Sequence, residues 1–140
     1  MNDYFIEPEV AGQLGEKTIL DTSTHPPIVK YLHFIFYGWL GDDIIECFPV
    51  FLITEKLKLK LDEINLTGYR INECEIEVSE EFKLLQSNTI LPVFYWLEVI
   101  GGDKDDFEIL KNKLKVSDTA YSILKQFNLQ NAIVEISKSN

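Results

Sequence analysis

Cysteine is scarce in this sequence: there are two residues, Cys47 and Cys74, and they stand far apart in a chain of 140 residues. Small domains that depend on disulfides carry many more cysteines, and zinc sites need cysteine and histidine ligands in close groups. The two histidines, His25 and His33, form no such group with the cysteines. We therefore expect neither a disulfide scaffold nor a metal site, and the sequence points to no cofactor.

Basic residues are also in the minority, with 13 Lys and Arg against 23 Asp and Glu and a net charge of −10. A domain that binds DNA or RNA needs a basic surface to neutralise phosphates. The one basic run, formed by Lys56, Lys58 and Lys60, is flanked by acids. We expect no nucleic-acid partner, because an acidic surface would instead attract a basic protein or a cation.

Long apolar runs are missing as well. The most apolar stretch, residues 31–40, contains His33 and Gly38. It is much shorter than the roughly 20 residues that a membrane-spanning helix needs. Residues 1–4 carry no basic segment of the kind that begins a secretion signal. We expect a cytoplasmic protein with no membrane contact.

The chain does have enough apolar material for one core, since 46% of its residues are hydrophobic and these include 9 Phe, 6 Tyr and 2 Trp. A domain of this size buries about two thirds of the surface that its unfolded chain exposes. We expect a single domain over residues 1–140. Residues 1–27 would form a first strand at 4–6 and an irregular, turn-rich connector at 9–27, and residues 28–140 would form the core.

Apolar runs and alternating patterns predict the strands. Residues 28–39 are apolar on both alternating sets, which is typical of a central strand covered on both faces. Residues 73–78 alternate cleanly, with Cys74, Ile76 and Val78 directed to the core and three glutamates directed outward. Further strands are expected at residues 44–45, 50–53, 93–100, 107–110 and 114–116.

The segment 53–68 supports two readings. Residues 56–61 alternate with a period of two, as a strand does, but the apolar residues of 53–64 also fall on one face of a helix. Thr54 is a favoured helix N-cap residue, and Gly68 suits the turn that ends a helix.

An internal repeat favours the helix. When the chain is aligned with itself so that Thr54 falls on Ser117, Gly68 falls on Asn131. We call this register the repeat alignment. The apolar set of the second copy is helical and not alternating. We therefore expect two strand–helix–strand modules, and a further short helix capped by Ser79. The resulting fold class is α+β: a mixed, mainly antiparallel sheet with two or three short helices.

Catalytic signatures are absent from the sequence. There is no Gly-x-Ser-x-Gly motif and no glycine-rich loop that opens a helix for phosphate. Cys47 has no signature of a nucleophile around it. His33 lies in an apolar strand, so we expect it to be a hydrogen-bonded core residue. We therefore do not expect this chain to be an enzyme.

Acidic residues gather in two loops, and these loops carry the candidate binding residues. One loop holds Asp42, Asp43 and Glu46, and the other holds Asp105 and Asp106 beside Asp103. Such loops are commonly solvated turns, but paired carboxylates also bind divalent cations. Trp39 stands next to the first pair, and tryptophan is favoured at the centre of protein interfaces.

A set of short motifs runs through residues 35–134. They are Trp39-Leu-Gly-Asp-Asp-Ile-Ile-Glu-Cys-Phe-Pro49, Ile53-Thr-Glu-Lys-Leu57, Leu66-Thr-Gly68, Ser79-Glu-Glu-Phe82, Leu91-Pro92, Trp96-Leu97, Asp105-Asp-Phe107 and Val116-Ser117. In these motifs the chain resembles a family of small bacterial proteins similar to the immunity proteins of polymorphic toxin systems. The resemblance implies a strand–capped helix–strand plan and a role in occluding a toxin, and it brings no catalytic residues.

The sequence thus predicts a protein-binding domain, with a basic toxin domain as the expected partner. The expected binding residues are Trp39, Asp42, Asp43 and Glu46, with Asp105 and Asp106 as a second patch. Two alternatives stay open. One is a small metal-dependent hydrolase in which Asp42 and Asp106 converge on a cation, and the other is a structural homodimer. The sequence does not give the oligomeric state.

Overall fold

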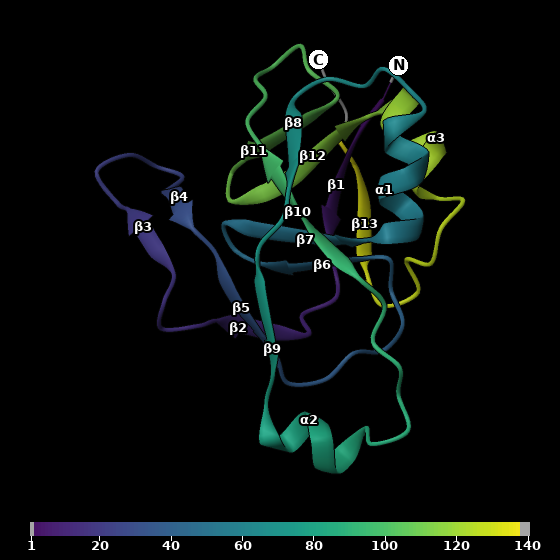
Figure 1. The fold of residues 1–140 in the computed structure, drawn as a ribbon. Helices are drawn as coiled ribbons and strands as arrows, with labels where there is room; N and C mark the ends of the chain where they lie inside the picture. Colours follow the sequence, from purple (N-terminus) through teal and green to yellow (C-terminus); the bar gives the residue numbers. More distant parts are fainter. Residues whose placement is uncertain (1, 138–140) are drawn as a thin grey trace.

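The computed structural model describes residues 2–137 and has an α+β fold in which most strand pairs are antiparallel, as expected (Figure 1). The strands form two four-stranded sheets, a three-stranded sheet and a two-stranded ribbon. The strands are β1 Asp3–Glu7, β2 Gly12–Leu14, β3 Ile19–Asp21, β4 Ile28–Tyr31, β5 His33–Phe36, β6 Ile44–Cys47, β7 Val50–Thr54, β8 Tyr69–Asn72, β9 Glu75–Val78, β10 Phe94–Val99, β11 Phe107–Leu110, β12 Lys113–Ser117 and β13 Ile133–Ser137. The helices are α1 Glu55–Asp62, α2 Glu80–Leu85 and α3 Asp118–Leu124.

The repeat expected from the sequence is present in the structure and is longer than expected. The repeat alignment carries β6 onto β11, β7 onto β12, and α1 onto α3. Each unit is a hairpin, a helix and a strand, and the last strands are β8 in the first unit and β13 in the second.

Each unit is completed by a strand from outside it. The first sheet has the order β6-β7-β10-β8 and the second has the order β11-β12-β1-β13. Strand β10 precedes the second unit in the chain but pairs into the sheet of the first unit. Strand β1 precedes the first unit but pairs into the sheet of the second unit. The registers agree: Trp96 pairs with Leu52 in one sheet, and Phe5 pairs with Lys115, the equivalent of Leu52, in the other. The two units therefore exchange their leading strands, which ties residues 3–7 to the C-terminal half.

The helices begin where the sequence predicted. Thr54 caps α1 and accepts the amide of Leu57, and Ser117 caps α3 and accepts the amide of Ala120. Ser79 caps α2 in the same way. These hydroxyls satisfy amides that have no partner inside the helix. The reading of residues 55–62 as a helix is confirmed.

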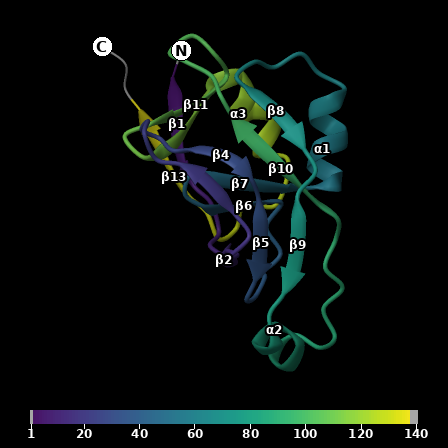
Figure 2. The same cartoon turned by 60° about the vertical axis from the view of Figure 1, so that its left-hand side comes forward.

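Two hydrophobic cores fill the molecule. The first lies between the two four-stranded sheets and includes the inner faces of α1 and α3. The second lies on the other face of the first unit, where β2, β5, β9 and α2 cover it. In both views α2 stands at the end of the molecule away from α1 and α3 (Figure 1, Figure 2).

The equivalent face of the second unit has no such cover among the described residues, and its side chains differ accordingly. Leu52 in the covered face is matched by Lys115 in the uncovered one. Lys115 is only 7% exposed, and its ammonium lies 3.0 Å from Glu108 and 3.7 Å from both Asp3 and Asp103. The covering layer therefore explains why one copy of the repeat is apolar on both faces and the other is not.

Three details differ from the sequence prediction. The connector 9–27 contains β2 and β3, because strands this short give no periodic signal. The strand expected at 28–39 divides into β4, which forms the ribbon with β3, and β5, which is central in the three-stranded sheet. Gly68 has the positive φ of +99° that was expected, but it leads into β8 and does not cap α1, which ends at Asp62 with Glu63 as its C-cap.

Candidate functional site

The two acidic pairs are structurally equivalent, since the repeat alignment places Asp43 on Asp106. Asp43 Oδ1 accepts the hydroxyl of Thr54 at 2.7 Å, and Asp106 Oδ1 accepts the hydroxyl of Ser117 at 2.6 Å. Each of these hydroxyls is also a helix cap. Each carboxylate therefore orients the residue that starts the helix of its own unit.

The second oxygen of each carboxylate reaches the other unit. Asp43 Oδ2 accepts the amide of Asn128 at 2.8 Å, and Asp106 Oδ2 accepts the amide of Thr67 at 2.9 Å. Both amides belong to the segment that follows the helix of the opposite unit. The two aspartates thus form reciprocal ties between the units.

Burial corrects the expectation that Asp42 and Asp43 meet a partner. Asp42 is fully buried, and its oxygens accept the amide and the side-chain Nδ2 of Asn131, both at 2.9 Å. Asp43 is 4% exposed. A buried carboxylate must be satisfied within the chain, so these two groups are not available to basic groups of another protein. Asp105 is half-buried and accepts the amide of Gly102 at 2.8 Å.

The carboxylates do not assemble into a metal site. Asp42 is engaged by Asn131, and Asp106 is engaged by Ser117 and Thr67. Across residues 2–137, no group of three or more His, Cys, Asp or Glu side chains is placed to hold a metal ion.

Glu46 differs from the other candidate acids of the two loops because Oε1 of its half-buried carboxyl lacks a hydrogen-bond partner among the described residues. Burial, together with the nearby charge of Glu7, raises the pKa of Glu46 to about 7. Its neighbour Cys47 is also half-buried, and burial raises the pKa of that thiol. The thiolate is the nucleophilic form of cysteine, and this burial disfavours it.

The loop that carries Trp39 is held rigidly by side chains distant in sequence. Gln86 Oε1 accepts the amide of Trp39 at 2.7 Å, and Gln86 Nε2 donates to the Trp39 carbonyl at 2.9 Å. Glu9, 4% exposed, accepts the amides of Leu40 and Asp42 at 2.7 and 3.2 Å. Burial raises the pKa of Glu9, while these two amides oppose the rise.

The indole of Trp39 belongs partly to the core. It packs edge-on to Phe94 with ring centroids 5.8 Å apart, and its N–H donates to the Asp42 carbonyl at 2.9 Å. Trp39 is half-buried, and the other tryptophan, Trp96, is a core residue that is 9% exposed. Trp39 is thus a support for the loop as well as part of its surface.

The five most exposed large apolar side chains of the described residues occur around this loop and α2. Val10 and Leu40 are 74% and 72% exposed and line a hollow of about 470 Å³ together with Trp39 and Gln86. A second hollow of about 350 Å³, lined by Phe82 and Leu91, also borders Gln86. We call this region the apolar end, defined by Val10, Trp39, Leu40, Leu84, Leu85 and Ile90, of which the last three are 79%, 81% and 90% exposed.

The repeat supplies an internal comparison for the Trp39 loop. The repeat alignment places Trp39 on Gly102 and Leu40 on Asp103, while the following two aspartates are kept. The second unit forms the same hairpin and helix with glycine and an exposed aspartate at these positions. The fold of this unit therefore does not require Trp and Leu in the loop.

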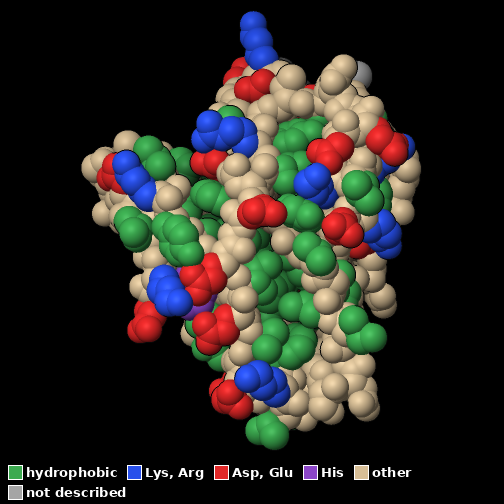
Figure 3. Space-filling model, in the orientation of Figure 1, with side chains coloured by type: hydrophobic (Ala, Val, Ile, Leu, Met, Phe, Trp, Pro, Cys, Tyr) green, Lys and Arg blue, Asp and Glu red, His purple; other side chains and the backbone are tan. Residues whose placement is uncertain are grey.

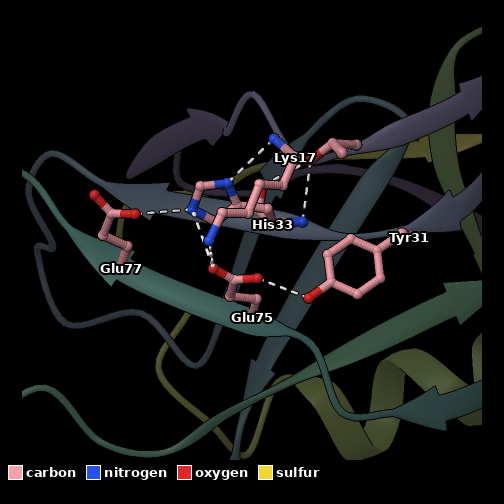
Figure 4. Close-up of polar contacts among 6 residues, drawn as sticks. Lys17, Tyr31, His33, Glu75 and Glu77 are labelled. Atoms are coloured by element: carbon pink, nitrogen blue, oxygen red, sulfur yellow. Dashed lines mark hydrogen bonds and ion pairs between the residues drawn. The ribbon is translucent and has the colours of Figure 1, made fainter.

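A polar cluster at the root of the β3–β4 ribbon surrounds His33 (Figure 4). His33 is 2% exposed, and its Nε2 lies 2.9 Å from Glu77 while its Nδ1 lies 3.4 Å from the amide of Lys17. Glu75 accepts Lys17 Nζ at 2.8 Å and the Tyr31 hydroxyl at 2.7 Å. The prediction of a hydrogen-bonded core histidine is confirmed, and the cluster fastens the ribbon to β9.

The apolar end contains residues that sequence reasoning missed. Glu9 and Gln86 support the Trp39 loop, but isolated Glu and Gln residues carry no sequence signal of such a role. Leu84 and Leu85 follow the buried Phe82 on a short helix, and only the tertiary structure shows that they face outward.

No helix among residues 2–137 has the length and apolar character needed to span a membrane. The chain matches no protein-family model, and comparison with curated proteins and with solved structures finds no similar protein.

Proposed function

We propose that this chain binds another protein through the apolar end. The observation that carries the proposal is the pair Trp39–Leu40, which stands where the equivalent loop has Gly102 and Asp103. Leu40 is 72% exposed on a backbone fixed by Glu9 and Gln86. A rigid loop that presents a large apolar side chain loses little conformational entropy on binding.

The exposed side chains of α2 and the following loop extend this surface. Large exposed apolar patches on otherwise polar proteins mark interaction sites. A second copy of the chain is a poor partner for the apolar end, because two molecules with a net charge of −10 repel each other. The same charge favours a basic partner.

The specific form of the proposal is an immunity protein that occludes a bacterial toxin. It rests on the motif resemblance and on the charge, and the Trp39 motif of that resemblance lies in the apolar end. Of the residues expected to bind, Trp39 is retained in the proposed surface. Asp105 and Asp106 lie in the equivalent loop of the other unit, and their carboxylates accept hydrogen bonds within the chain, so the proposal gives them no direct contact.

The test is a capture experiment with three baits: the wild-type chain, Leu40→Asp and Leu59→Asp. Leu40→Asp installs the residue that the equivalent loop carries. Leu59 is 56% exposed on α1, outside the apolar end, and serves as the matched control. Lysate of a bacterium that encodes the chain is the source of partners, and mass spectrometry identifies them.

We expect one stoichiometric partner with wild type and Leu59→Asp, and its loss with Leu40→Asp. The proposal makes Leu40 a hot spot of the interface, and loss of a hot-spot side chain costs at least about 2 kcal/mol, or a roughly 30-fold weaker complex. Equal capture by all three baits would assign binding to another surface. A dimer mass in light scattering that Leu40→Asp abolishes would instead identify the partner as a second copy.

A further inference from the structure

A different hollow lies between the β3–β4 ribbon and β10, apart from the apolar end. Its volume is about 250 Å³. In the space-filling view, hydrophobic side chains gather over the middle of the molecule, to the right of the β3–β4 ribbon (Figure 3). Apart from Glu98, the residues that line the hollow are hydrophobic, among them Ile28 from the ribbon side and Pro49, Trp96 and Ile100 from the body, and backbone groups add polar surface to its walls.

Glu98 is the one charged residue among the described residues that line this hollow. Its side chain is 17% exposed. Oε1 accepts Arg70 Nε at 3.2 Å and Asn72 Nδ2 at 2.9 Å. No described residue donates to Oε2. A carboxylate with one oxygen of unused acceptor capacity therefore lines the hollow beside hydrophobic side chains.

The repeat shows what meets the equivalent carboxylate in the other unit. The strand registers make Glu7 of β1 the equivalent of Glu98 of β10, because their partners across the sheet, Ile133 and Arg70, coincide in the repeat alignment. Glu7 Oε2 lies 3.8 Å from the ammonium of Lys113. The repeat alignment places Lys113 on Val50, which is fully buried and apolar. The second unit thus pairs this carboxylate with a lysine of β12, whereas the first unit has no lysine at that position and pairs Glu98 through Oε1 with Arg70 of β8.

We propose that this hollow binds a protonated aliphatic amine. The alkyl chain packs against Trp96, Pro49 and Ile100, and the ammonium donates to Glu98 Oε2. Arg70 leaves this oxygen free because its largely exposed guanidinium contacts Oε1. The net charge of −10 attracts a cation. A free alkylamine and the lysine side chain of a partner protein share this chemistry.

The experiment is a titration followed by NMR, with the indole N–H signals of the two tryptophans as reporters. Trp96 lines the hollow, whereas Trp39 lies in the apolar end and serves as the internal control. The probes are 1-pentylamine, the neutral 1-pentanol of equal length, and Nα-acetyl-lysine methylamide. Comparison of the first and third probes separates a free amine from a lysine side chain.

We expect at least one of the two amines to shift the Trp96 signal and leave Trp39 unchanged. It should bind about tenfold tighter than 1-pentanol, because a charge-assisted hydrogen bond is stronger than a neutral one. Glu98→Gln should remove this preference. Glu135→Gln, which removes the same charge from an exposed position on β13, should preserve it.

A second variant keeps the proposal testable if Glu98→Gln disturbs the fold. Ile28 is 47% exposed at the edge of the hollow, and Ile28→Trp should fill the space and abolish amine binding without touching the carboxylate. The proposal is overturned if neither amine shifts Trp96, if 1-pentanol binds as tightly as the amines, or if Ile28→Trp binds them unchanged.

Discussion

Asp43 and Thr54 are joined by two hydrogen bonds: the Thr54 hydroxyl donates to the Asp43 carboxylate at 2.7 Å, and the Thr54 amide donates to the Asp43 carbonyl at 3.0 Å. Ser117 makes the same two bonds to Asp106, at 2.6 and 2.9 Å. The acidic pairs that stand out in the sequence are therefore parts of the repeat. Asp43 and Asp106 each orient the residue that starts a helix and join the two units.

Asp43→Ala should destabilise the protein strongly. The change leaves the Thr54 hydroxyl and the Asn128 amide without their acceptor, and unsatisfied buried groups cost about 1–3 kcal/mol each. We expect a loss of about 2–4 kcal/mol in the free energy of unfolding, measured with urea. Asp103→Ala is the control, because Asp103 is 90% exposed and its loss should change stability by less than about 0.5 kcal/mol. Equal effects of the two changes would contradict the role of Asp43.

Glu46→Gln should change the pH dependence of stability. The pKa of Glu46 is raised from 4.5 to about 7, so between these values the folded protein binds a proton that the unfolded chain does not. Wild-type stability should fall as pH rises through this window and then level off. The variant lacks this loss, and above pH 7 we expect it to be more stable by about 1–2 kcal/mol, a value discounted for partial solvent access. Below the unfolded pKa the two proteins should be nearly equal. Urea unfolding across the pH range measures this, and parallel curves would refute it.

Gly15→Ala should destabilise the root of the ribbon. A Cβ at Gly15 would overlap the imidazole of His33, which is buried and held by Glu77. Overpacking of this kind typically costs about 1–3 kcal/mol. Gly102→Ala is the matched control, since no atom lies within 4 Å of a Cβ there. Thermal unfolding should separate the two variants, and a stable Gly15→Ala protein would mean that His33 can move.

Leu40→Asp should leave the fold intact, whereas Trp39→Ala should weaken it. Leu40 is 72% exposed, so its replacement should change the free energy of unfolding by less than about 0.5 kcal/mol. Trp39 packs on Phe94, and removing its ring should cost about 2 kcal/mol or more. Urea unfolding of both variants tests this. A large loss with Leu40→Asp would show that the side chain serves stability and would remove the basis for assigning it to binding.

The local pattern was sufficient to locate most elements. The Thr54, Ser79 and Ser117 caps were readable because an N-cap acts on amides only two or three residues away. The repeat decided between a strand and a helix for residues 56–61, because the apolar residues of its second copy follow a helical spacing and do not alternate. The short strands β2 and β3 were missed, since strands of this length have no periodicity to detect.

The candidate site was predicted only in part. Trp39 was expected to bind because tryptophan is favoured at the centre of protein interfaces, and its role in binding stays a prediction. Asp42 and Asp43 were misplaced, because the chain segments that bury them, at residues 128 and 131, are distant in sequence. Leu84, Leu85 and Ile90 gave no signal, since exposure depends on which face of a short helix the rest of the fold covers.

The sequence by itself determined the fold class, the three helices with their caps, the repeated module and the acidic charge, because each depends on neighbouring residues or on composition. Only the tertiary structure decided that the two units exchange β1 and β10, that the aspartates are internal ties, and that one unit alone is covered by a second layer within the described residues. These features depend on contacts between segments far apart in the chain, and hydrophobic burial, which drives such contacts, has no direction that a local pattern could record.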